Sequence, residues 1–119
     1  MAQAPKKINI EYSDFADVNQ AEIPDAILLT GNVRISHDGA ILTCKKAYFF
    51  SKENYVKAFG EVQIVQGDTL FLNSKYAEYN GNVKQAYATG NVVLKSPDMR
   101  LVTDTLNFDR VSQEAYYKT

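Results

Sequence analysis

The 119-residue sequence contains no tryptophan, one cysteine, one histidine and three prolines. The single cysteine, Cys44, excludes an internal disulfide framework. The single histidine, His37, excludes the usual His/Cys zinc site and provides no obvious support for a Ser-His-Asp triad. No run of about 18 apolar residues is present, so no segment is predicted to cross a membrane as a helix. These absences leave no positive support for an enzyme, and we expect neither a metal ion nor a cofactor.

An excess of charge of one sign is also lacking. Thirteen basic and fourteen acidic residues give a formal net charge of -1 and an isoelectric point near 5.8. Such a chain is not attracted to a phosphate backbone, so nucleic acid is not expected as a partner. The hydrophobic fraction of 45% and the charged fraction of 23% are those of a folded globular protein, and the length suits one domain.

Residues that favour strands are abundant, and they recur in a repeat. Eight tyrosines and six phenylalanines accompany many valines, isoleucines and threonines, which pack well on a pleated sheet. The segments 31–35, 60–64 and 90–94 each begin with glycine and then alternate apolar with polar residues. They are spaced by 29 and 30 residues, which indicates about three copies of one unit.

The copies agree beyond these opening segments. Each unit next reaches a turn that contains an acid, at Asp38, Asp68 and Asp98. A second turn is expected at 51–54, at 80–82 and near 109–112. We therefore predict an all-β protein in which each unit consists of several short strands, separated by turns and buried on one face.

The ends of the chain fit the repeat less well. Residues 1–26, interrupted by Pro24, are interpreted as a leading segment with a degenerate first repeat. Residues 27–119 hold the repeats, with units starting near 31, 60 and 90. Thr119 falls where another unit would begin, so we expect the array to be truncated there. Residues 2–5 are candidates for the start of a mature chain whose signal peptide has been removed.

Stacking the units aligns apolar side chains into columns. Such columns predict a continuous apolar interior, which is either a filled core or a groove that stays partly uncovered along a seam. Stacked repeats also leave their terminal strands unpaired, and these edges invite another copy or a long ligand. The columns comprise Val33, Val62 and Val92; Ile35, Ile64 and Leu94; Leu42, Leu72 and Leu101; and Phe49, Tyr79 and Phe108.

The remaining polar residues of interest have simple structural interpretations. His37 is predicted to be a turn residue, and Cys44 is predicted to be a small buried thiol because it aligns with Ser74 and Thr103. The repeated acids suit turns and lack the dense oxygen donors of a calcium loop. Solvated surface charge, or contact with phosphates at the rim of a groove, are the two interpretations for Arg34, Lys45, Lys46 and Lys95.

The ordered motifs resemble the OstA/LptA-like family of lipopolysaccharide-transport proteins. The resemblance covers roughly residues 27–119 and rests on the Gly-Asn-Val openings, the stretches 38–44 and 66–70, and the joins 58–62 and 88–92. Each motif is short, so the specificity comes from their order and period. The stretches 38–44 and 66–70 are most similar to the OstA-like proteins of Bacteroidetes-type bacteria. The degenerate leading unit and the abrupt end depart from a compact single-domain bridge protein.

The resemblance implies a fold, a ligand and partners. It implies an incomplete, twisted β-jellyroll in the periplasm, associated with outer-membrane biogenesis, whose apolar groove shields the acyl chains of lipopolysaccharide. The twelve column residues are then the expected lipid-binding residues. The resemblance further implies head-to-tail assembly, with copies of the chain or with other jellyroll modules, into a bridge between the inner and outer membranes.

Two other classes of protein remain open at this point. The first is a structural β-repeat or an adhesin-like interaction module with a filled core and no lipid ligand. The second is a carbohydrate-active enzyme or lectin on a β scaffold, although the spacing of the acids does not indicate that any pair converges.

Overall fold

The computed structural model describes residues 6–18 and 26–118, and these residues form one antiparallel sheet. Its hydrogen-bonded order is β1-β3-β4-β5-β6-β7-β8-β9, with β2 also pairing with β3. No helix within the described ranges is long and apolar enough to cross a membrane. The strands are β1 Asn9–Tyr12, β2 Phe15–Asp17, β3 Ala26–His37, β4 Ala40–Phe50, β5 Tyr55–Gln66, β6 Leu70–Asn80, β7 Gln85–Ser96, β8 Met99–Asp109 and β9 Glu114–Lys118.

Each repeat contains two long bent strands, so the prediction of several short strands per unit is wrong. β5 and β6, for example, have 12 and 11 residues and pair along most of their length. The recurring glycine lies in the middle of the first strand and not at its start. At Gly60 the backbone φ is +82°, and Glu61 and Gly60 together face one residue of β6. A bulge of this kind bends a strand without ending its pairing.

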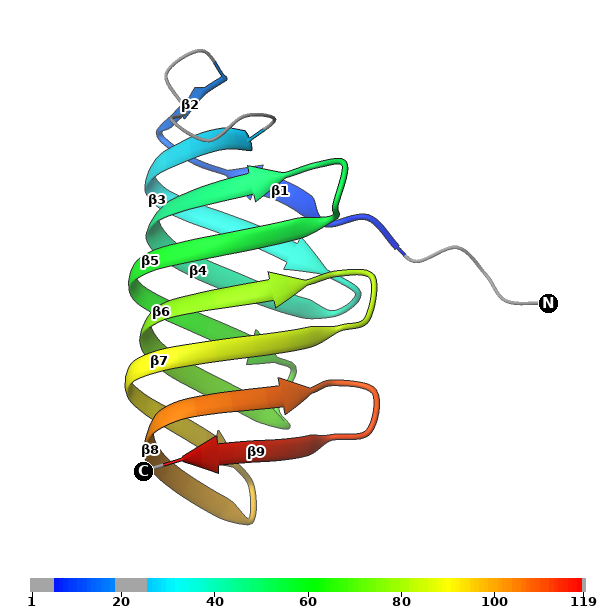
Figure 1. Cartoon of the computed structure of the whole chain (residues 1–119), viewed down its shortest axis with the longest axis vertical. Helices are drawn as coiled ribbons and strands as arrows, with labels where there is room; N and C mark the ends of the chain where they lie inside the picture. Colours follow the sequence, from blue (N-terminus) through cyan, green and yellow to red (C-terminus); the bar gives the residue numbers. More distant parts are fainter. Residues whose placement is uncertain (1–5, 19–25, 119) are drawn as a thin grey trace, which may run out of the picture.

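The bends stack and fold the sheet into two facing halves. Gly31 and Gly90 have φ values of +83° and +89°, and each lies at the same register shift as Gly60. Figure 1 shows the bends on one side of the molecule and the hairpin turns on the other. The sheet is open, because β1 with β2 forms one edge and β9 forms the other. The all-β prediction is confirmed, and the fold is the incomplete β-jellyroll that the family resemblance implies.

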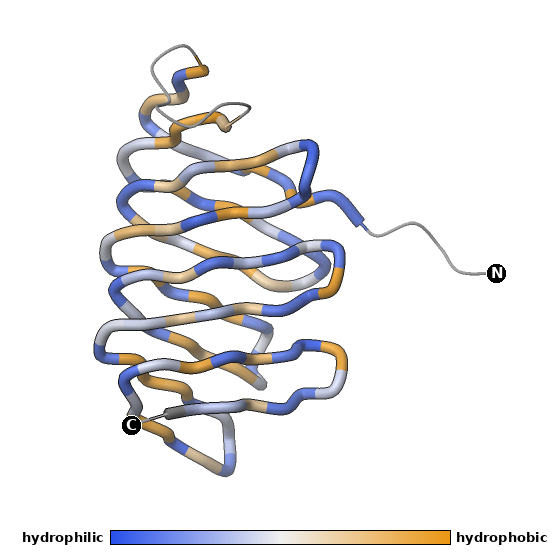
Figure 2. Tube along the Cα trace, viewed as in Figure 1, coloured by the Kyte–Doolittle hydropathy of each residue, from blue (hydrophilic) through white to orange (hydrophobic). Residues whose placement is uncertain are grey.

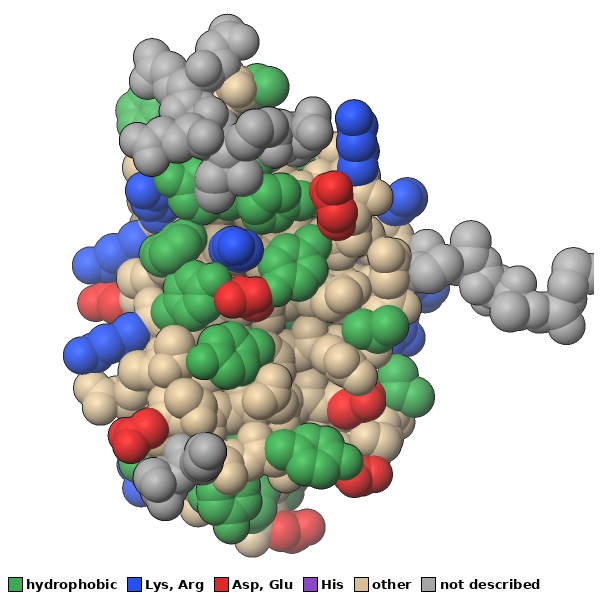
Figure 3. Space-filling view, in the orientation of Figure 1, with side chains coloured by type: hydrophobic (Ala, Val, Ile, Leu, Met, Phe, Trp, Pro, Cys, Tyr) green, Lys and Arg blue, Asp and Glu red, His purple; other side chains and the backbone are tan. Residues whose placement is uncertain are grey.

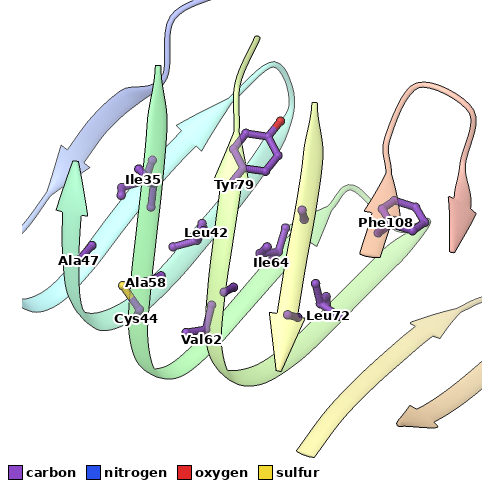
Figure 4. Packing of buried hydrophobic residues seen from close by; sticks show 14 of the residues in the cluster. Ile35, Leu42, Cys44, Ala47, Ala58, Val62, Ile64, Leu72, Tyr79 and Phe108 are labelled. Carbon is purple, nitrogen blue, oxygen red and sulfur yellow. The ribbon is translucent and has the colours of Figure 1, made fainter. Parts of the chain in front are cut away.

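The core lies between the two halves. Apolar and polar residues alternate along each strand, as the tube in Figure 2 shows, and the apolar ones point inward in Figure 4. Beside the bends the core residues are small: Ala47, Ala58, Ala77 and Ala88 are fully buried and are paired in a row across β4 to β7. Alanine at these positions lets the two halves approach closely next to the fold line.

Candidate functional site

The twelve column residues come together in the interior. Eleven of them are at most 8% exposed, and Leu101 is partly buried against the same cluster. Ile35, Leu42, Ile64 and Leu72 are paired in a row across β3 to β6 and point into the space between the halves in Figure 4. The predicted convergence of the columns is therefore present, and their role as lipid-binding residues stays a prediction.

Most of this interior is closely packed. The cavity near the β3–β4 turn has a volume of only about 10 Å³. Four of the predicted residues, Ile35, Leu42, Ile64 and Tyr79, line it together with His37. A volume of that size holds about one water molecule, so an acyl chain reaches these residues only if the halves separate.

The C-terminal end of the interior is open. A cavity of about 440 Å³ lies there, between the turns that flank β6 and β8 on one side and strand β9 on the other. Three predicted residues, Leu94, Leu101 and Phe108, contribute to its wall. Its further apolar lining residues are Leu70, Met99, Ala115 and Tyr117. The sequence predicted an uncovered lining along a seam, whereas the structure has it at this end, next to an edge strand.

Between these regions the two halves meet at a seam formed by their hairpin turns. The first lip consists of the turns at 38–39, 67–69 and 97–98, and the second lip consists of those at 51–54, 81–84 and 110–113. Arg110 of the second lip joins them. Its guanidinium donates to the backbone oxygens of His37 and Asp38, at 3.2 and 2.8 Å, and to Gln66 Oε1 at 2.8 Å.

Two lysines strengthen the seam around the carboxylate of Asp38. Lys84 of the second lip forms an ion pair with it, and Lys6 Nζ lies 2.9 Å from its Oδ1. These hydrogen bonds hold the pKa of Asp38 well below its usual range. The carboxylate is therefore charged at neutral pH.

The N-terminal segment also lies along the seam. Ile8 is buried in the core cluster, and its backbone N–H donates to Asn54 Oδ1 at 2.7 Å. Asn54 Nδ2 donates in turn to the backbone oxygen of Lys6 at 2.8 Å. A Cβ at Gly81 would lie 2.9 Å from Ile8 Cγ1, so glycine is needed for this close approach.

His37 ends strand β3 and is buried in the seam, so the prediction of a turn residue is wrong by one position. Its Nε2 lies 2.9 Å from the Lys6 carbonyl oxygen, which accepts only, so Nε2 carries the proton. Nδ1 then accepts from Tyr79 Oη at 2.7 Å, and Tyr79 accepts from Arg110. Burial lowers the pKa of His37, and the nearby Arg110 acts in the same direction. The imidazole is neutral in this network.

Cys44 is a buried thiol, as predicted. Burial raises the pKa of Cys44 to about 11, which makes it a poor nucleophile. Its Sγ donates to the carbonyl oxygen of Lys46, two residues further along the chain. Ser74 and Thr103 make the same contact two residues ahead, at 3.0 and 3.2 Å. This shared hydrogen bond opposite each bulge explains why the aligned residues are all small donors.

The basic residues considered from the sequence make none of the seam contacts described above. Arg34 pairs with Glu11 at 2.9 Å, Lys45 Nζ lies 3.6 Å from Glu61, and Lys46 lies over the ring of Tyr48. Lys95 is exposed on β7. The seam cations Lys6, Lys84 and Arg110 were not singled out from the sequence. The partners of these cationic groups are 31 to 73 residues away, so no local pattern marks them.

An aromatic cluster covers part of the outer surface of β4 to β6. The ring of Phe59 lies 4.9 Å from that of Tyr76 and 5.8 Å from that of Tyr48. The hydroxyls of Tyr55 and Tyr76 both donate to Glu78. Figure 3 shows hydrophobic side chains gathered around a basic and an acidic one on this face. The part of the chain that the structure describes has no group of three or more His, Cys, Asp and Glu residues able to hold a metal ion.

The geometry and the sequence agree with a known family. The model of the OstA-like protein family matches residues 5–119, nearly the whole chain. The chain belongs to the OstA-like family. This OstA-like chain is thereby related to lipopolysaccharide transport, in a family of transport and binding proteins. Among curated proteins, none matches its sequence.

Proposed function

We propose that this OstA-like chain is a periplasmic lipopolysaccharide-binding and transport module that shields acyl chains in its apolar interior. One observation carries the proposal: the interior between the two halves opens at the C-terminal end into a cavity of about 440 Å³ beside edge strand β9. Leu94, Leu101 and Phe108 are the first of the twelve predicted residues that an acyl chain meets there. The other nine are reached as the halves separate.

The energetics favour a long interior. Burial of one methylene contributes about 0.8 kcal/mol, and a single myristoyl chain gives only marginal, reversible attachment. A lipid with several acyl chains therefore needs an extended apolar lining. Repeats whose bulges lie at the same place supply that length, because each additional repeat adds a layer of the same cross-section.

Assembly belongs to the same proposal. Strand β9 forms one edge of the sheet, and a second module, either a copy of the chain or another jellyroll, can pair with it by strand addition. Head-to-tail pairing joins the interiors and extends them between the inner and outer membranes. In this proposal residues 27–119 form the repeat array, and residues 1–26 form its leading segment.

Photo-crosslinking tests the lipid site with a matched pair of neighbouring positions. Leu101 lines the open end, whereas Val102 points outward and is 54% exposed. A photoreactive residue at 101 is expected to form adducts with purified lipopolysaccharide, and the same residue at 102 is not. Absence of adducts at 101, in a protein with an unchanged thermal transition, contradicts the proposal.

Sedimentation over a concentration series tests assembly. The size of the assembly is expected to grow in steps as the concentration rises. Tyr117→Lys, which adds a charge at the open end, should raise the concentration needed for assembly by about tenfold. Val83→Lys places the same charge in an exposed turn and should have no effect. One unchanging size at every concentration excludes head-to-tail assembly.

A second candidate is an interaction module with a filled core and no lipid ligand. The observation that favours it is the close packing around the cavity of about 10 Å³. In that case the outer aromatic cluster is the natural contact surface, because aromatic residues are enriched at protein interfaces. The crosslinking pair separates the two candidates, since a filled module gives adducts at neither position.

A further inference from the structure

The seam holds an unequal set of charges. Lys6, Lys84 and Arg110 bring three cations to it, and Asp38 is the carboxylate with which the two lysines pair. Arg110 contacts only uncharged oxygens among its described partners, which are His37 O, Asp38 O, Gln66 Oε1 and Tyr79 Oη. With His37 neutral, this cluster carries more positive than negative charge.

The cluster lies directly over the apolar interior. His37 and Tyr79 both belong to the seam network and line the cavity of about 10 Å³ below it. The cavity wall beneath them is formed by Ile35, Leu42 and Ile64, with Val56. Cations at the mouth of an apolar interior are complementary to an amphiphile with an anionic head group and an alkyl tail.

Side chains of the protein itself fill this site. The carboxylate of Asp38 lies among the cations, and the side chain of Ile8 is inserted into the core between the lips. Lys6 and Asp38 are both partly solvated, and ion pairs of this kind are weak. A phosphate offers more acceptor oxygens than a carboxylate, and arginine binds it through two parallel hydrogen bonds. A phosphate group is therefore able to replace Asp38.

We infer that the seam is the binding site for the phosphate head group of an amphiphile, with Asp38 and Ile8 holding the places of its head and tail. The inference rests on the proposed function, because it names the residues that recognise the head of the same ligand. Binding exchanges the carboxylate for the phosphate, displaces the segment containing Ile8 and lets the tail enter the interior. Lys84 and Arg110 then contact the phosphate from the second lip.

Calorimetric titration with three probes tests the inference. The probes are dodecyl phosphate, dodecyl maltoside and inorganic phosphate, each at concentrations where it is monomeric. The wild-type chain is expected to bind dodecyl phosphate more tightly than dodecyl maltoside. Lys84→Gln should weaken the binding of dodecyl phosphate by about tenfold and leave the binding of dodecyl maltoside unchanged. Asp38→Asn should strengthen the binding of dodecyl phosphate. The control Lys75→Gln, at an exposed position by the bend, should change the binding of neither dodecyl probe.

The other outcomes are distinguishable. Equal binding of the two dodecyl probes, unaffected by Lys84→Gln, overturns the head-group site and leaves the proposed function standing. Inorganic phosphate bound as tightly as dodecyl phosphate shows a site for free phosphate and also overturns it. Binding of none of the probes, by variants that retain the wild-type thermal transition, overturns it as well, and the Leu101 crosslink then decides the proposed function separately.

Discussion

Replacing Leu72 by alanine is expected to lower the free energy of unfolding by about 3 kcal/mol. Leu72 is 2% exposed and lies in the core between β5 and β7, paired with Ile64 and Leu94. Its removal deletes buried methylenes and leaves a cavity that closely packed neighbours fill only in part. Chemical denaturation followed by circular dichroism measures the loss.

The adjacent Phe71 is the control, because it points outward and is 37% exposed. Phe71→Ala is expected to cost less than half as much, since most of the lost contact is with solvent-facing neighbours. A loss at Leu72 of no more than about 0.5 kcal/mol, the range of surface substitutions, contradicts a packed interior in solution. That result would mean that the halves already stand apart without ligand.

Gly90→Ala is expected to cost about 3 kcal/mol, because two unfavourable effects add at the bend. The φ of Gly90 is +89°, in the left-handed region that residues with a Cβ rarely adopt. The new Cβ would also lie 2.8 Å from the Cβ of Lys75, which belongs to the backbone-proximal part of that side chain and moves little. The same denaturation measurement applies.

Gly39 separates the two effects. Its φ is +87°, close to that of Gly90, but nothing lies within 4 Å of a Cβ built there. Gly39→Ala therefore carries the conformational cost alone, about 1 kcal/mol. Equal losses at the two glycines would show that contact between the bent strands does not constrain the bulge. A larger loss of stability at Gly90 supports the bulge, in which two residues of one strand face one residue of the next.

The sequence predicted the interior well, because the alternation within each repeat indicates which side chains face inward. Leu42, Cys44 and Ala47 point inward, and the three-residue step from 44 to 47 is visible in the alignment of the units. The bend itself was not predicted. The sequence pattern of Gly60 followed by alternating residues is the same whether a strand starts at this glycine or bends there. Only the pairing on both sides of Gly60 distinguishes the two.

The open end and the seam could not be predicted from the sequence, for a different reason. Whether Leu101 or Leu72 faces solvent depends on the distance between the halves, which no repeat unit encodes alone. The partners of Arg110 lie up to 73 residues away, and Ile8 comes from a segment that does not follow the repeat. Local patterns identify what points inward, and long-range contacts decide how tightly the interior is closed.

The reach of Arg110 has a consequence for biogenesis. A chain that is made or translocated N-terminus first completes its first hairpin long before residue 110 emerges, so the guanidinium partners at His37 and Asp38 stay hydrated in the meantime. The β3–β4 hairpin is thus held by a residue of the turn at 110–113. Closure of the seam is therefore coupled to synthesis of the third repeat. A nascent chain that stops before residue 110 keeps the apolar face of its sheet accessible to chaperones.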